Sequence, residues 1–155
     1  MFRDDAVSGR GRIWDGIIPI LSKYIILGSG ANTFMFAYPQ NDYIYRAYYD
    51  IPNVFDVKAH NLYLQQWVEN GMFAMIAFIA FYLCYAVKSV RIYRKIDFKN
   101  QLSIIGFGIF VGTMTYMIVG FANDSNVCTA PVFWIILGLG MAVNQIVKEK
   151  FLQHD

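Results

Sequence analysis

The chain contains 155 residues, of which 57% are hydrophobic and only 15% are charged. A soluble domain of this length is much less apolar, so the composition predicts a protein of the lipid bilayer. The formal net charge of +2 is too small to indicate a nucleic-acid partner. Cys84 and Cys128 form neither a CxxC motif nor a Cys/His cluster, so we expect no disulfide, metal or cofactor, and we expect Cys84 to be a packing residue.

Residues 1–70 are predicted to form a loop region outside the membrane, with short amphipathic helices. Residues 13–25 carry apolar side chains at helical spacing, and Pro19 should kink or interrupt that helix. Gly28 is expected to follow its C-terminal cap. The sequence GSG at 28–30 lacks the preceding strand and the following Lys-Ser/Thr of a phosphate-binding P-loop, so a turn is the better interpretation. Residues 32–57 predict a long, aromatic-rich loop that lies on the membrane face or covers a cavity.

Residues 59–71, AHNLYLQQWVENG, begin a helix that leads towards the membrane. Asn61 is a plausible cap for this helix, and Tyr63, Leu64 and Trp67 are expected to pack it. Glu69 is expected to pair with a cation. We predict that the helix continues from about His60 into the following apolar segment as one rod.

Three apolar segments, at 72–87, 102–122 and 132–147, predict transmembrane helices within the region 71–148. About 20 residues suffice to cross a hydrocarbon core of about 30 Å. Asn144 and Gln145 interrupt the third segment, and Pro131 is well placed to start it. The sequence therefore predicts an all-α polytopic integral membrane protein with about three transmembrane helices.

Basic residues predict the orientation of these helices. The loop 88–100 carries five basic residues against one acid, Lys148 directly precedes the tail, 149–155, and Lys150 lies in it. The loop 123–131 has no basic residue. The positive-inside rule places the loop 88–100 and the tail in the cytoplasm, and residues 1–70 outside.

The N-terminus, MFRDDAVSGRGR, has no apolar segment of the kind that an export signal needs. An external region without such a signal predicts that Met1 is an internal start and that earlier membrane spans are missing. The alternative is a short natural gene product that pairs with a partner protein.

Three short motifs occur in a fixed order: SGRGRIW at 8–14, GSGANTF at 28–34 and AHNLYLQQWVENG at 59–71. Their order and spacing resemble the C-terminal part of the O-antigen ligase and lipid-linked-glycan polymerase family, from about Ser8 to about Leu139. The resemblance implies transfer of a glycan, with inversion, from a polyprenyl diphosphate donor to the hydroxyl of a glycan or lipid acceptor. It also implies a location in the bacterial cytoplasmic membrane. The absence of an Asp-x-Asp pair agrees with metal-free transfer.

The resemblance assigns roles to individual residues. Arg10 matches the arginine of SGR-x-x-x-W and would bind the donor pyrophosphate through its planar charged fork, with Arg12 as a weaker candidate. His60 would activate the acceptor hydroxyl, and Asn61 would contact substrate. Without the resemblance, a solvated arginine and a hydrogen-bonded surface histidine are the simpler interpretations. The polar loop at 123–125 is expected to contribute to the rim of the cavity.

Two other functional classes stay open at this stage. A truncated fragment or accessory membrane subunit would need none of this chemistry. A transporter is the weaker alternative, because no charged residue lies at the centre of the three predicted spans to act as a relay.

Overall fold

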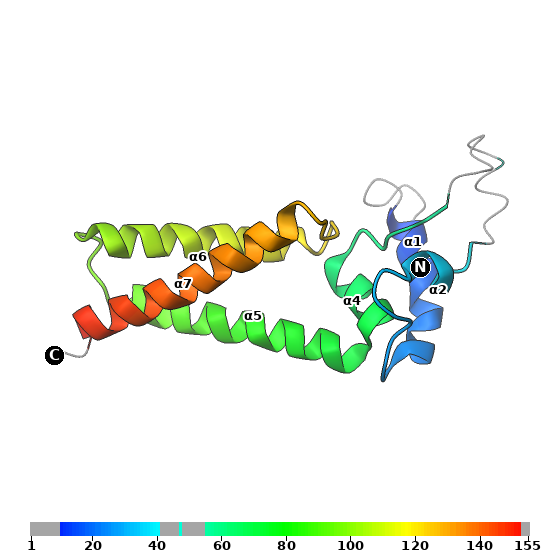
Figure 1. The fold of residues 1–155 in the computed structure, drawn as a ribbon, viewed down its shortest axis with the longest axis horizontal. Helices are drawn as coiled ribbons and strands as arrows, with labels where there is room; N and C mark the ends of the chain where they lie inside the picture. Colours follow the sequence, from blue (N-terminus) through cyan, green and yellow to red (C-terminus); the bar gives the residue numbers. More distant parts are fainter. Residues whose placement is uncertain (1–9, 41–46, 48–54, 153–155) are drawn as a thin grey trace. The chain divides into compact units, whose positions relative to one another are not determined.

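The computed structural model describes residues 10–40, 47 and 55–152, and these residues form helices and loops without a strand (Figure 1). This confirms the predicted all-α class. Ser8 and Gly9 of the first motif, and much of the predicted aromatic loop, lie outside the described residues. The helices are α1 (Arg10–Ile17), the 3₁₀ helix η1 (Ile18–Tyr24), α2 (Phe34–Ala37), α4 (Leu62–Asn70), α5 (Met72–Tyr93), α6 (Gln101–Val119) and α7 (Thr129–Leu152).

The chain divides into two compact units. The first comprises Met1–Ala77 together with Gly120–Asp124, and the second comprises Phe78–Val119 together with Ser125–Asp155. The candidate site lies in the first unit. The greater part of the three long apolar helices forms the second.

Pro19 interrupts the first amphipathic helix, as predicted. The α-helical geometry of α1 ends at Ile17, and Pro19 is the second residue of η1. Proline lacks the N–H that an α-helical turn would use, so the chain continues as a tighter 3₁₀ turn. The prediction that Gly28 follows the cap is wrong, because η1 ends at Tyr24 with Ile25 as its C-cap.

A small hydrophobic core holds the first unit together. Ile13 and Ile17 of α1 pack with Phe34 of α2, Val68 of α4 and Ala59, which directly precedes His60. Tyr38 joins this cluster and stacks on Phe34, with ring centroids 5.4 Å apart. The core therefore fixes α1 and α4 against the segment that precedes His60.

Gly71 separates α4 from α5, so the predicted continuous rod is wrong. Gly71 adopts φ +92°, and a Cβ at this position would lie 2.4 Å from the carbonyl oxygen of Ile26. Because only glycine accepts this combination readily, the helix stops here. The amide of Met72 donates to the carbonyl of Ile25 at 2.9 Å. The prediction overlooked this contact because Ile25 is distant in sequence.

The GSG segment forms no helix or strand: it bends at Ser29 and leads into a turn at Ala31 and Asn32, just after the predicted position, and it caps the end of α4. The amides of Ser29 and Gly30 donate to the carbonyls of Val68 and Glu69 at 2.8 and 2.9 Å. The last carbonyls of a helix lack intrahelical partners, so these bonds satisfy them. Gly28, with φ +68°, allows the close approach, since a Cβ added at this position would lie 2.3 Å from the carbonyl oxygen of Glu69.

Three helices are long and apolar enough to cross a membrane: Met72–Tyr93, Gln101–Val119 and Thr129–Lys150. This confirms the three predicted spans with different ends. The first and third helices extend further than predicted, because lysine and arginine continue a helix well. The second ends at Val119, and Pro131 lies in the first turn of the third, where its missing N–H costs little.

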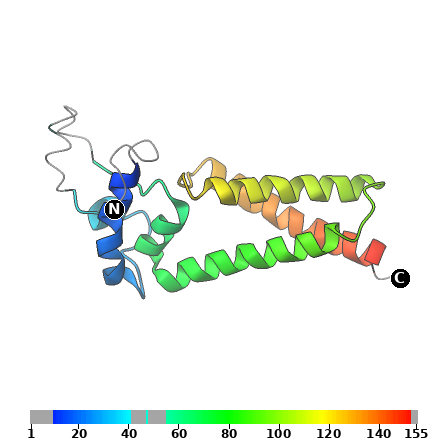
Figure 2. The ribbon, with the colours of Figure 1, turned by 180° about the vertical axis from the view of Figure 1, so that it is seen from behind.

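Within the second unit, α6 lies beside α7, as both views show (Figures 1 and 2). Asn144, which interrupted the predicted third span, is buried and donates to Ser89 of α5 at 2.7 Å. Its side-chain amide therefore forms a hydrogen bond between α7 and α5. Cys84 is exposed, so the prediction that it packs inside this chain is wrong.

Candidate active site

Gly120–Asp124 packs against the start of α4. The amide of Leu62 donates to the carbonyls of Gly120 and Asn123 at 2.8 and 3.0 Å. The ring of Phe121 lies against that of Tyr63, with centroids 4.6 Å apart. These contacts join segments that lie about 60 residues apart in the sequence. They also agree with the prediction that Tyr63 is a packing residue.

Asn61 caps α4, as predicted. Its Oδ1 accepts hydrogen bonds from the amides of Tyr63 and Leu64, both at 3.0 Å. Its Nδ2 donates to the carbonyl of Phe121 at 2.9 Å. Asn61 is buried, and it thus fixes both the start of the helix and the neighbouring loop. His60 precedes it directly in a left-handed backbone conformation, with φ +48°.

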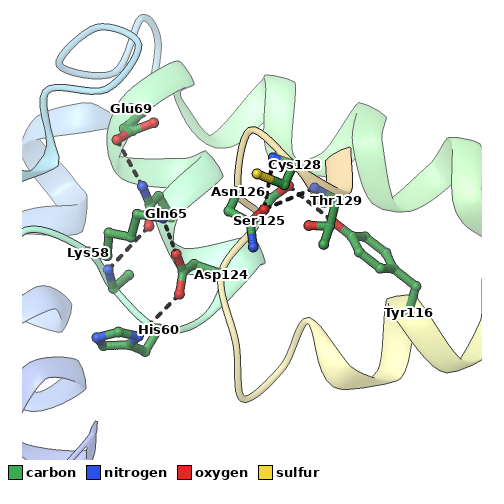
Figure 3. Close-up of polar contacts among 11 residues, drawn as sticks. Lys58, His60, Gln65, Glu69, Tyr116, Asp124, Ser125, Asn126, Cys128 and Thr129 are labelled. Carbon is green, nitrogen blue, oxygen red and sulfur yellow. Dashed lines mark hydrogen bonds and ion pairs between the residues drawn. The ribbon is translucent and has the colours of Figure 1, made fainter. Parts of the chain in front are cut away.

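The carboxylate of Asp124 lies between Lys58 and His60 (Figure 3). His60 Nδ1 is 3.1 Å from Asp124 Oδ1, and Lys58 Nζ donates to Asp124 Oδ2. The Asp124 side chain is 11% exposed, whereas that of His60 is 41% exposed. The imidazole is therefore held by a largely but not fully buried carboxylate, while a large part of the imidazole surface remains open.

The surroundings of Asp124 keep its carboxyl group ionised. Burial by itself would raise the pKa of Asp124, but the hydrogen bond and the positive charge of Lys58 outweigh it and lower the pKa below the ordinary 3.8. An ionised carboxylate can only accept a hydrogen bond, so Nδ1 of His60 carries the proton. The Nε2 atom of neutral His60 then has a free lone pair that can accept a proton.

Arg10 contacts the same loop. It is the first residue of α1, and its guanidinium donates to the carbonyl of Ala122, two residues before Asp124. The side chain is half-buried, and a guanidinium has five N–H donors, of which this contact uses one. The structure therefore brings Arg10 and His60 to the single segment Gly120–Asp124.

Arg12 and Trp14 hold the segment that leads to His60. Arg12 Nη2 pairs with the two carboxylate oxygens of Asp56 at 2.9 and 3.0 Å, and both side chains are 14% exposed. Trp14 Nε1 donates to the carbonyl of Ala59 at 2.9 Å. The spacing between Arg10 and Trp14 thus allows one helix to contact both sides of the site.

Gln65 supports the same segment from α4. Its Oε1 accepts a hydrogen bond from the amide of Ala59 at 3.2 Å, and its Nε2 donates to Glu69 at 3.1 Å. The hydrogen-bond partner of Glu69 in the described residues is thus an amide rather than the expected cation. In the described part of the chain, no three His, Cys, Asp or Glu side chains gather in a way that could hold a metal ion.

Lys58 and the specific role of Asp124 escaped the sequence analysis. The polar residues at 123–125 stood out between two apolar segments, and this was the available signal. Nothing local indicated which of them faces His60, because the contact joins positions 64 residues apart.

Three candidate spans and a polar site formed by residues before and between them define a polytopic membrane protein. The chain belongs to the O-antigen ligase family, since the model of that family matches residues 1–79. Searches of curated proteins and of solved structures gave no match. The family indicates a glycosyltransferase-type enzyme that uses lipid-linked glycan and acceptor substrates. Arg10, His60 and Asn61 lie within the matched segment, and Asp124 lies after it.

Proposed function

We propose that the chain is the C-terminal portion of an O-antigen ligase/polymerase-like glycosyltransferase. In the full-length protein, this enzyme moves a glycan from a polyprenyl diphosphate to an acceptor hydroxyl during cell-surface polysaccharide assembly. The observation that carries the proposal is the 3.1 Å contact between His60 and Asp124, which orients an accessible imidazole.

His60 acts as the general base in this proposal. The acceptor hydroxyl oxygen attacks the anomeric carbon of the donor, and Nε2 of His60 takes the hydroxyl proton. The bond between the anomeric carbon and the diphosphate oxygen breaks, and the diphosphate leaves with the electron pair, which inverts the configuration. Asp124 stabilises the imidazolium that forms, in the manner of a base held by a carboxylate.

Arg10 binds the diphosphate. Its guanidinium retains N–H donors beyond the one that contacts Ala122, and charge-assisted hydrogen bonds to phosphate oxygens stabilise the departing diphosphate. Arg12 is the weaker candidate for this role, because its guanidinium pairs with Asp56.

Asn61 was predicted to contact substrate, and that assignment stays a prediction. Its Oδ1 and Nδ2 already bond to the α4 backbone and to Phe121. We therefore propose that it acts mainly by positioning His60.

The proposed site faces outward from the bacterial cytoplasmic membrane, with the loop 88–100 and the residues 149–155 in the cytoplasm. The basic residues of that loop support this orientation. In a cysteine-free background, a cysteine at Ser125 should react with an impermeant thiol reagent added outside intact cells, and one at Asn100 should not. Equal reaction at both positions is incompatible with the orientation.

The experiment that tests the function uses the purified full-length protein and a lipid-linked glycan donor. His60→Ala should lower transfer by a factor of about 10² to 10⁴, the usual contribution of a positioned general base. Membrane insertion should stay normal, because His60 lies outside the spans and outside the core of the first unit. Transfer within a few fold of the parent enzyme would exclude His60 as the base.

A further inference from the structure

A cavity of about 480 Å³ lies between the C-terminal halves of α5 and α7. Three cations line it: Lys88 and Arg91 from α5 and Lys148 from α7. All three side chains are exposed, so their charged groups are available to a ligand. The cavity lies entirely within the second unit and uses no residue of the candidate active site.

The described chain does not neutralise this charge. No acidic residue is among the residues that line the cavity. The two described acids at this end of the unit have other partners: Asp97 pairs with Lys99 at 3.1 Å, and Glu149 accepts a hydrogen bond from Gln145. The cavity therefore presents three positive charges to an anion.

The same cavity has an apolar part. Phe81 and Met141 line it and are 41% and 43% exposed. Each lies seven residues before a lysine of the same helix, Lys88 or Lys148. At 1.5 Å per residue this offset places the apolar side chains about 10 Å closer to the N-terminal ends of the helices than the cations. Charge and apolar surface thus follow one another in the same order on both helices.

A hydrogen bond between the two helices forms the cavity in advance. Asn144 lines it, and its Nδ2 donates to Ser89 Oγ at 2.7 Å, with both residues buried. The C-terminal ends of α5 and α7 accordingly lie side by side (Figures 1 and 2). A polar contact inside an apolar bundle holds the helices at a fixed spacing.

We propose that this cavity binds the head group of an anionic phospholipid. The phosphate accepts hydrogen bonds from Arg91 and the two lysines, and the first part of the acyl chains lies against Phe81 and Met141. Basic pockets between transmembrane helices recognise anionic lipids in this way. A soluble phosphate would satisfy the cations and leave the apolar part of the cavity without a partner.

Native mass spectrometry of the purified full chain tests the proposal, with phosphatidylglycerol, phosphatidylcholine or glycerol phosphate added in turn. Phosphatidylglycerol should bind more tightly than phosphatidylcholine. The triple variant Lys88→Gln, Arg91→Gln, Lys148→Gln should weaken this binding by about 10-fold to 100-fold, from the usual contribution of a basic residue near an anionic lipid surface. Glycerol phosphate should neither bind at similar concentration nor displace the lipid.

The matched control is the triple variant Arg94→Gln, Lys95→Gln, Lys150→Gln. It removes one arginine and two lysines from exposed positions in α7 and in the residues just after α5, none of which lines the cavity. It should keep phosphatidylglycerol binding within about threefold, since the lost charges act only at long range. The proposal is overturned if both triple variants weaken binding equally, if phosphatidylcholine binds as well as phosphatidylglycerol, or if glycerol phosphate displaces the lipid.

Discussion

Asp124 Oδ1 lies 3.1 Å from His60 Nδ1, although the two residues are 64 positions apart and lie on opposite sides of two long apolar helices in the sequence. The contact depends on the docking of Gly120–Asp124 against the start of α4. The contact fixes the tautomer of His60, which directly precedes Asn61, the cap of α4. That relationship is the basis of the proposed chemistry.

Lys58 should control the pH range in which this contact works. Lys58→Met removes the hydrogen bond and the charge that lower the pKa of Asp124, and burial then raises that pKa. The acid limb of glycan transfer should therefore move to higher pH, while Lys58→Arg should keep it near that of the parent enzyme. The measurement is the transfer rate as a function of pH, with Lys23→Met as a control at an exposed lysine of the same unit.

The same ion pair should affect stability with a definite sign. Because the folded pKa of Asp124 is lowered, its contribution is present above the ordinary 3.8 and is lost as the pH falls through the folded value. Lys58→Met should thus lower the free energy of unfolding at neutral pH by about 1 kcal/mol or less, as for a partly exposed ion pair, and the melting temperature with it. An acid limb and a neutral-pH melting temperature equal to those of Lys23→Met would contradict this account of Asp124.

Arg10 and Arg12 should fail in different ways. Arg10→Ala should slow transfer, because its transition state loses about 1 to 3 kcal/mol of charged hydrogen bonding. Arg10→Lys should slow it less, and both should change the melting temperature little. Arg12→Ala should instead lower the melting temperature, because the 14% exposed carboxylate of Asp56 loses its cation. Joint replacement of Arg12 and Asp56 by alanine should recover part of that loss. If Arg12→Ala reduced transfer at unchanged stability and Arg10→Ala did not, the assignment of the two arginines would be reversed.

Gly71 should be required for folding of the first unit. A Cβ there would meet the Ile26 carbonyl at 2.4 Å, and φ +92° is strained for any other residue, so Gly71→Ala should destabilise the protein by more than about 1 kcal/mol. Gly108→Ala is the matched control, because nothing in the described structure lies within 4 Å of the added Cβ. Thermal unfolding in detergent compares the two, and equal melting temperatures would show that the close backbone approach at Gly71 is not important.

The sequence predicted the parts of this fold that depend on local pattern. The three spans follow from apolar length, the break at Pro19 from a missing N–H, and the cap at Asn61 from its side-chain acceptor. The break at Gly71 was missed, because a glycine within a helical pattern does not reveal that a distant backbone segment lies against it. The predicted environment of His60 was incomplete for the same reason. Lys58 is near His60 in the sequence, but Asp124 reaches His60 only because the loop Gly120–Asp124 docks against α4.

The most direct test of the central claim is a double-mutant cycle on His60 and Asp124 in the full-length enzyme. His60→Ala and Asp124→Asn should each lower transfer by about 10² or more, the second because an amide no longer fixes the tautomer or stabilises the imidazolium. The double variant should be no worse than the weaker of the two single variants, since residues that act as one unit are not additive. Multiplied losses in the double variant, or an Asp124→Asn enzyme as active as its parent, would contradict a base formed by His60 and Asp124 together.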